Sequence, residues 1–251
     1  MNTFTYCKSL HPTNAIDSYN AAISERPSNG TISSGSRKKR SVGDHTKFWT
    51  PGRTLKILVF QYDEHTFEIV KKGALKWLPY ISLKFEFLEM DEQDIYSSEE
   101  FLGDIRVNFQ PSFASGGGSS IGTDALTGCP HDASMQLGTN FSSPHYEGMV
   151  IHEFGHALGL NHEHQHPDAN IPWDREKTYL YYQNVMGFTK QEVDFNVLPL
   201  ERVPGRTYTP YDRQSVMHYN VRNELTIGDW QQTASMQISE GDIAMMKKAY
   251  P

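Results

Sequence analysis

The chain carries its clearest signature in Val150-Ile-His-Glu-Phe-Gly-His-Ala-Leu-Gly-Leu-Asn-His-Glu163. His152 and His156 are four residues apart, so on a helix they differ by about 40° in direction and about 6 Å in height. Both imidazoles can therefore reach one point. Glu153 lies about 100° round the helix, where its carboxylate can reach a metal-bound water without displacing it. This spacing predicts two zinc ligands and a general base.

His162 fits the same site only if the helix ends before it. On a continued helix it would lie about 240° from His156 and about 9 Å further along the axis, facing away from the metal. Gly159 can adopt a positive φ at little cost and turn the chain back. Three neutral imidazoles leave a zinc position open for water, as in catalytic sites. We therefore expect one catalytic Zn²⁺ ion held by His152, His156 and His162.

Ser215-Val-Met-His-Tyr219 forms a second motif downstream. Together with the extended helix motif, this methionine-bearing turn resembles the metzincin clan of zinc peptidases. Glu163, directly after the third histidine, and the Met-His-Tyr sequence resemble the astacin family within that clan. The resemblance covers about residues 47–251, and its weaker signs are Trp49-x-x-Gly52 and the closing Tyr250-Pro251, as in bacterial astacin-like chains.

The resemblance implies a metzincin-type catalytic domain with two further site residues. Met217 is implied as a hydrophobic support beneath the metal. Tyr219 is implied as an additional zinc ligand that can swing to the developing oxyanion, and a phenol can donate to an oxygen that gains charge. After Glu163 the chain departs from the family pattern, and its two cysteines cannot form the two disulfides usual in animal astacins. The family's link between that glutamate and the mature amino terminus is therefore not carried over.

The hydrophobic patterns predict an α+β chain whose sheet-forming segments all precede residue 140. With the resemblance, they indicate a twisted, mostly parallel sheet with two long helices in the front half, and an irregular rear half ending in a helix. Strands are expected at Thr54–Phe60, Leu83–Leu88, Ile105–Phe109, Ser120–Asp124 and Ser134–Leu137. Helices are expected at Asp63–Trp77, Ser143–Gly159 and Arg175–Val185, with a last one opened by Ser239. By family analogy, an extended substrate lies along Ser120–Asp124, which could equally be a passive loop.

Charge and hydropathy exclude several classes of protein. The net charge of -7 argues against a general nucleic-acid binder. No apolar run approaches the ~20 residues needed to span a membrane. The first 25 residues lack the apolar core of a secretory signal. We expect a secreted monomer that leaves the cell by another route or has lost a leader.

Residues 1–46 lack a sustained hydrophobic period and are interpreted as a flexible extension. They carry the basic run Ser36-Arg-Lys-Lys-Arg-Ser41, which is either a solvated linker or a processing site that would make the extension a pro-segment. Cys7 has three readings: a free thiol, a bridge to Cys129, or a thiolate that occupies the open zinc position and keeps the enzyme latent.

The histidines outside the core motif are expected to be structural. His164 and His166 follow the motif in an exposed-looking segment, as ordinary loop residues or, less simply, an accessory metal site. His218 is expected to be structural within the turn.

The function predicted from these motifs is zinc-dependent hydrolysis of internal peptide bonds in proteins or peptides. Residues 47–251 form the catalytic domain, with Glu153 as base and Tyr219 as oxyanion donor. The alternative is a non-catalytic binding module on a metzincin frame, against which the intact Glu153 counts.

Overall fold

The computed structural model describes residues 7–10, 12, 14–30, 45–60, 62–90, 92–202 and 208–251. Its described strands form one sheet in the order β1-β5-β6-β4-β2-β3. The strands are β1 (Cys7–Leu10), β2 (Thr54–Val59), β3 (Lys84–Leu88), β4 (Ile105–Phe109), β5 (Gly117–Ser120) and β6 (Met135–Leu137). All neighbours are parallel except β5 and β6. The predicted α+β class with a mostly parallel sheet is confirmed.

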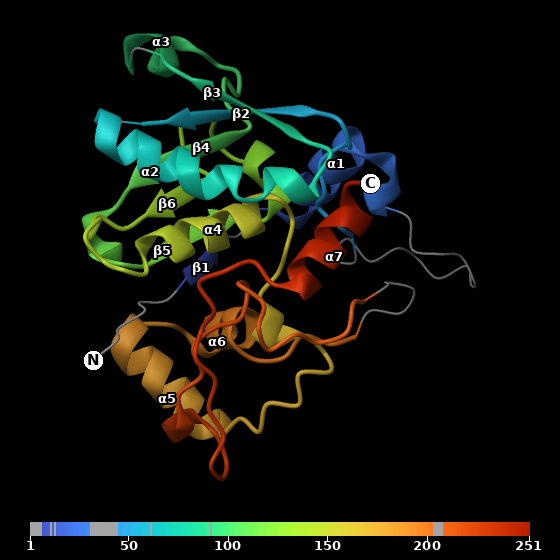
Figure 1. The fold of residues 1–251 in the computed structure, drawn as a ribbon, viewed down its shortest axis with the longest axis vertical. Coiled ribbons are helices and arrows are strands. Elements are labelled where there is room, and N and C mark those ends of the chain that lie inside the picture. Colours follow the sequence, from blue (N-terminus) through green and yellow to red (C-terminus); the bar gives the residue numbers. More distant parts are fainter. Residues whose placement is uncertain are drawn as a thin grey trace.

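The helices divide between the two halves of the molecule (Figure 1). They are α1 (Ala15–Glu25), α2 (Glu64–Leu75), α3 (Glu92–Ser97), α4 (Tyr146–Ala157), α5 (Arg175–Met186), α6 (Lys190–Asn196) and α7 (Glu240–Ala249). The long helices α2 and α4 lie side by side against the sheet. They approach closely because Gly73 has no side chain, and a Cβ there would lie 2.4 Å from Val150 Cγ1. These are the two long front-half helices that the sequence predicts.

The main core lies between the sheet and these two helices. Phe67, Val70 and Ala74 of α2 face it, as the three- and four-residue spacing predicts. Every residue of α4 from Gly148 to Ala157 is buried, so α4 is a central helix rather than a surface one. Polar side chains on such a helix need partners inside the protein.

The lower half contains α5, α6 and long irregular segments, and it has its own apolar cluster of Tyr182, Phe188, Val193, Val197, Leu198 and Leu225. Among the described residues no strand of the sheet comes from it, in agreement with the expectation that sheet segments precede residue 140. Helix α7 begins at a capping box of Ser239 and Asp242, also as predicted.

Two predicted boundaries are wrong. The strand expected at Ser120–Asp124 is instead β5, which ends at Ser120. Gly122–Leu126 forms a 3₁₀ helix, because Gly122 has φ +49° and leaves the extended region. The helix expected from Ser143 begins at Tyr146, because Ser143 and Pro144 belong to a preceding turn in which the Tyr146 amide donates to the Ser143 carbonyl.

The flexible extension predicted for residues 1–46 is wrong for its described part. Strand β1 pairs in parallel with β5, and α1 packs near the C-terminal end of the chain. The Ser18 hydroxyl donates to buried Asp124, and Arg26 donates to the Ala249 carbonyl at 2.8 Å. These contacts are polar and join residues far apart in the sequence, so the hydrophobic pattern of residues 1–46 does not predict them. The basic run at residues 36–41 lies outside the described residues.

Within the described residues, no helix has both the length and the apolar character needed to cross a membrane.

Candidate metal centre

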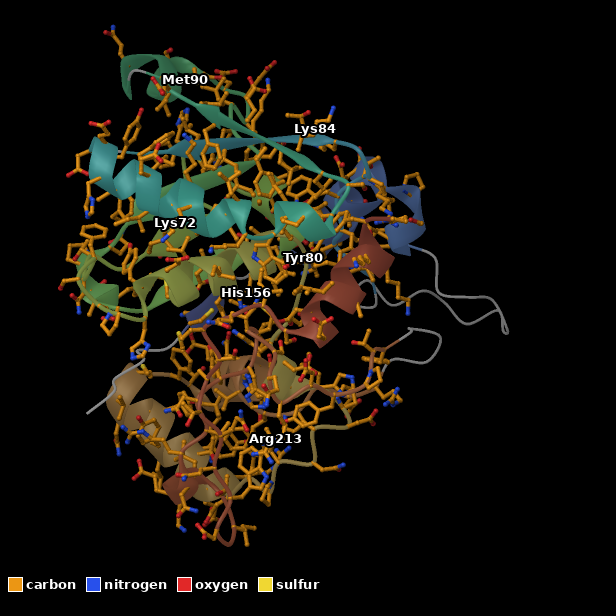
Figure 2. The ribbon with its side chains drawn as sticks, in the orientation of Figure 1. Lys72, Tyr80, Lys84, Met90, His156 and Arg213 are labelled. Atoms are coloured by element: carbon orange, nitrogen blue, oxygen red, sulfur yellow. The ribbon has the colours of Figure 1, made fainter. Side chains whose placement is uncertain are left out.

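The buried helix α4 brings His152 and His156 together, with ring centroids 4.9 Å apart (His156 is labelled in Figure 2). His156 lies between the sheet-bearing half and the lower half of the molecule. Its Nδ1 is 2.8 Å from the Leu160 carbonyl, and His152 Nδ1 is 2.7 Å from the Val216 carbonyl. Carbonyl oxygens only accept, so each Nδ1 carries the hydrogen and each neutral ring keeps its lone pair on Nε2.

Gly159 ends the helix and redirects the chain, as predicted. It has φ +98°, and a Cβ there would lie 2.7 Å from the Phe48 ring. The turn brings His162 back to the other two histidines. Its ring centroid is 4.4 Å from that of His156 and 5.4 Å from that of His152. The structure therefore brings the three sequence-predicted ligands to one point.

The three rings fit a divalent metal ion. His152 Nε2 is buried without a hydrogen-bond partner, and His156 Nε2 lies 2.9 Å from His162 Nε2. Burial lowers the pKa of His152 to about 4 and that of His156 to about 3, and it also lowers the pKa of His162. Neutral rings with converging lone pairs are the donor set that zinc takes.

Cys7 from β1 completes a four-residue cluster. One ligand atom from each of Cys7, His152, His156 and His162 lies within 4.8 Å of the others. The Cys7 Sγ atom is 3.4 Å from His162 Nε2 and 3.3 Å from Glu153 Oε2. Cys7 is buried and Cys129 is exposed, and both thiols are free, so the predicted alternative of a bridge between them is wrong. Three imidazoles and one thiol would supply the four donors of a closed, four-coordinate zinc site.

Glu153 lies beside the cluster, fully buried. Its Oε2 is near the Cys7 thiol, while Oε1 has no hydrogen-bond partner. Burial raises the pKa of Glu153 to about 8. Strand β5 has room for this carboxylate because Gly117 faces it, and a Cβ at that position would lie 2.8 Å from Oε1. The carboxylate therefore stands at the cluster with its Oε1 atom unpaired.

Tyr219 lies next to His162, with ring centroids 4.3 Å apart. Its phenol donates a hydrogen bond to the backbone carbonyl of Cys7. The acceptor of this hydrogen bond is therefore a peptide carbonyl oxygen. A peptide substrate presents the same kind of acceptor. His164 stacks on the phenol ring, with centroids 4.2 Å apart and an interplanar angle of 18°.

The turn around Met217 is anchored by Asp242 at the start of α7, a contact that the motifs do not reveal. Asp242 accepts from the Ser215 hydroxyl at 2.6 Å and from the Val216 amide at 2.9 Å. The Val216 carbonyl in turn accepts from His152. The Met217 Sδ atom packs against Gly155 of α4, where a Cβ would lie 2.4 Å away. This chain of contacts fixes the orientation of the first histidine.

His164 and His166 are buried, so the exposed loop predicted for them is wrong. His164 packs against Tyr219, and His166 packs edge-on against Tyr208 at 5.6 Å. In the described part of the chain they do not join a metal cluster. The His218 ring is hydrogen-bonded at 2.7 Å to the Tyr211 hydroxyl and is buried in the turn, in line with the structural role predicted for it.

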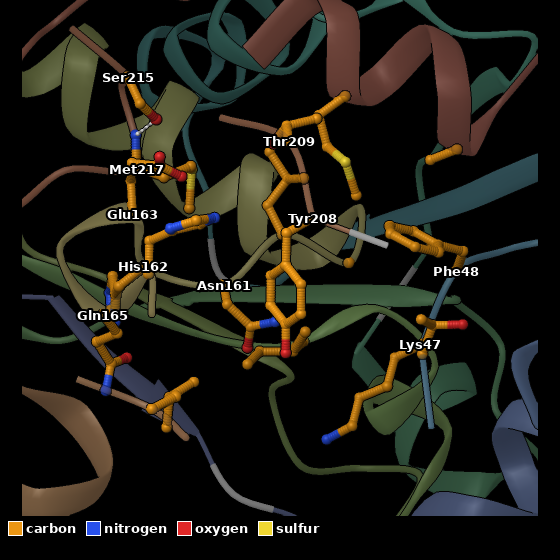
Figure 3. Close-up of a pocket in the computed structure, with 18 of the residues that line it drawn as sticks. Lys47, Phe48, Asn161, His162, Glu163, Gln165, Tyr208, Thr209, Ser215 and Met217 are labelled. Carbon is orange, nitrogen blue, oxygen red and sulfur yellow. Dashed lines mark hydrogen bonds between the residues drawn. The ribbon is translucent and has the colours of Figure 1, made fainter. Parts of the chain in front are cut away.

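A cavity of about 620 Å³ has His162 in its wall (Figure 3). Glu163, Ser215 and Met217 line one side, and Lys47 and Phe48 line the opposite side. Glu163 accepts the Asp212 amide at 2.7 Å, and burial raises its pKa to about 7. Glu163, the residue after the third histidine, is thus hydrogen-bonded to the segment that leads into the turn around Met217.

The fold and the cluster together define a zinc peptidase of the metzincin type. The model of the Astacin peptidase family matches residues 107–251, and the chain belongs to the astacin family. Astacins are zinc metalloendopeptidases, so the predicted enzyme class and the zinc cofactor are confirmed.

Two curated relatives carry the same similarity. Zinc metalloproteinase nas-39 of Caenorhabditis elegans is 32% identical over 117 residues, covering 41% of this chain and 12% of the relative. Bone morphogenetic protein 1 homolog of Strongylocentrotus purpuratus is 40% identical over 86 residues, covering 34% of this chain and 12% of the relative. The chain therefore spans only a small part of the length of these relatives.

Solved structures extend the similarity over more of the chain. The structure of myroilysin superposes with a TM-score of 0.71 at 32% identity and covers 82% of this chain and 96% of that one. High choriolytic enzyme 1, a hatching enzyme zinc-protease from Oryzias latipes, gives a TM-score of 0.50 at 18% identity over 80% of this chain and 92% of that one. This second likeness concerns the fold alone.

Proposed function

We propose that the chain hydrolyses internal peptide bonds at the His152–His156–His162 cluster, with Glu153 as the general base. The observation that carries this proposal is the convergence of the histidine Nε2 atoms beside the unpartnered Oε1 of Glu153. The chemistry that zinc supplies in such a site is a lowered pKa for water and polarisation of a carbonyl group. Substrates are proteins or peptides, and we propose that the protein acts as a secreted monomer.

Glu153 lies beside the cluster, and its Oε1 atom has no hydrogen-bond partner, so this atom is available to accept a proton. In its ionised form Glu153 takes a proton from the attacking water and later gives that proton to the leaving amine. Its fixed position between α4 and Gly117 keeps the carboxylate at the point of reaction. Tyr219 donates to the substrate carbonyl oxygen as that oxygen gains negative charge, in place of the Cys7 carbonyl that it now contacts.

The segment before residue 47 acts in this proposal as a pro-segment that keeps the enzyme latent. Cys7 stands among the histidines and would be the fourth ligand of a bound zinc ion, and β1 covers β5 as an added strand would. A substrate strand therefore competes with β1 for the same edge. Removal of the extension, for which residues 36–41 offer a basic processing site, frees both the cluster and β5.

The test uses the full chain with the double substitution Cys7→Ala/Lys8→Ala, called the opened chain below. It removes the thiol from the cluster and the ion pair between Lys8 and Glu192 that helps to hold β1. We expect the opened chain to cleave casein and peptides at least tenfold faster than the wild type, with activity lost on chelation and restored by zinc.

Adding Glu153→Gln to the opened chain should keep zinc bound and lower the rate by about 10²–10⁴-fold, since the base is lost and the shape is kept. Retained cleavage in this variant would refute the role of Glu153. Bound zinc without cleavage of any peptide by the opened chain would favour a non-catalytic binding module instead.

A further inference from the structure

Lys8 follows the cluster thiol directly and points towards the lower half of the molecule. Side chains alternate along β1, so Cys7 is buried at the cluster and Lys8 emerges on the other side. The Lys8 ammonium lies 3.1 Å from Glu192 Oε1 and 5.4 Å from the centroid of the Phe188 ring. Strand β1 lies between β5 and the lower half in Figure 1, which places these contacts between the two halves.

Glu192 and Phe188, the two side chains that contact Lys8, are held in place by their own neighbours. Glu192 belongs to the capping box of α6, in which its Oε2 accepts the Thr189 amide at 2.9 Å. Its Oε1 is thereby directed to Lys8. The Thr189 hydrogen bond, followed by Lys8, lowers the pKa of Glu192 to about 2. Phe188 is buried and stacks on Tyr182 with centroids 6.0 Å apart. The ring face of Phe188 and the ionised carboxylate of Glu192 thus contact the same cation, the Lys8 ammonium.

We propose that Phe188 and Glu192 form a specificity subsite for the lysine or arginine side chain of a substrate residue adjacent to the scissile bond. The inference rests on the proposed function and adds the substrate class. An extended substrate that replaces β1 along β5 alternates its side chains in the same way. The substrate residue that replaces Lys8, next to the one that replaces Cys7 at the cluster, therefore faces this subsite. In the full chain the Lys8 side chain occupies the subsite.

The surroundings favour a cationic residue at this point. Residues 48–251 carry a net charge of -11, since residues 1–47 contribute seven Lys/Arg against three Asp/Glu to the total of -7. The Lys8 and Glu192 side chains are about one-third exposed, 33% and 35%, so their ion pair alone adds little stability. The cation–π contact with Phe188 and the fixed carboxylate act together, and the expected selectivity is about fivefold to thirtyfold in kcat/KM.

The test compares three versions of the opened chain on a peptide library read by mass spectrometry. The first has no further change, the second carries Glu192→Gln and the third carries Asp194→Asn. Gln keeps the capping-box hydrogen bonds and removes the charge. Asp194→Asn makes the same charge change on the same helix at an exposed residue that contacts Tyr179 rather than Lys8.

Enrichment of Lys and Arg beside the cut in the first and third versions, reduced about threefold to tenfold in the second, is the expected result. Equal preferences in all three versions, or no preference for a basic residue, would overturn the subsite while leaving the proposed function intact. Absence of any cleavage refutes the proposed function itself, and a second readout then tests only the contact of Lys8 with Glu192 on which the subsite is built.

The second readout is hydrogen exchange of the β1 segment in the full chain, which needs no activity. Lys8→Ala should speed exchange of the 7–10 segment by about threefold to tenfold in the wild type. The same substitution should have a smaller effect in the Glu192→Gln background, because only the contact with Phe188 then remains to be lost. Additive effects of the two substitutions would show that Lys8 and Glu192 do not interact, and would overturn the subsite.

Discussion

Gly117→Ala should disable Glu153 without unfolding the protein or removing zinc. The added Cβ would lie 2.8 Å from Glu153 Cγ and Oε1 and 3.0 Å from Cδ. Favourable contacts between such atoms need about 3.5–4.0 Å, so the carboxylate has to retreat by about 1 Å. A misplacement of about 1 Å at a reacting group costs about 10²-fold in rate. We therefore expect kcat/KM of the opened chain to fall by about two orders of magnitude.

The assay is hydrolysis of a fluorogenic peptide by the opened chain with and without Gly117→Ala, together with zinc content and the melting temperature. The matched control is Gly128→Ala, where φ is +82° and no atom lies within 4 Å of the new Cβ. It costs about 1–2 kcal/mol of stability through backbone strain alone and should keep full activity. Activity of Gly117→Ala within about twofold of the opened chain, with zinc bound, would refute the close placement of Glu153.

Three further outcomes follow from the same contacts. Tyr219→Phe in the opened chain should lower kcat by about 10²–10³-fold at unchanged zinc content, and an unchanged kcat would exclude the oxyanion role. Asp242→Ala should lower the free energy of unfolding by about 1–3 kcal/mol in urea titrations, because the Ser215 hydroxyl and the Val216 amide lose their acceptor; equal stability would contradict that anchoring. In the wild type, Gly118→Ala should speed hydrogen exchange in β1 by about tenfold, since its Cβ would lie 2.7 Å from the Lys8 carbonyl; unchanged exchange would contradict the pairing.

The sequence predicts the parts of the fold that local patterns encode. Helices α2 and α7 show a regular apolar stripe or a capping box, and each lies close to its predicted position. The convergence of His152, His156 and His162 follows from helix geometry and one glycine, so it is predictable before any tertiary contact is known.

The parts that the sequence does not predict depend on contacts between distant residues. Strand β1 pairs with β5 more than a hundred residues away, and β5 itself reads Gly117-Gly-Ser-Ser120, which has little intrinsic strand preference. The place of Cys7 depends on that pairing, so the sequence leaves its role open among three alternatives. The polar neighbours of His164 predict an exposed residue, whereas the rings of Tyr219 and Trp173 pack against it in the buried interior.

The coordination of zinc in the full chain tests the central claim most directly. We predict that X-ray absorption at the zinc edge shows one ion per chain with nitrogen ligands and one sulfur at about 2.3 Å, and that Cys7→Ala removes the sulfur signal while the nitrogen ligands remain. A zinc site that keeps its ligands when His152 and His156 are replaced, or a shell without sulfur in the wild type, would contradict the account.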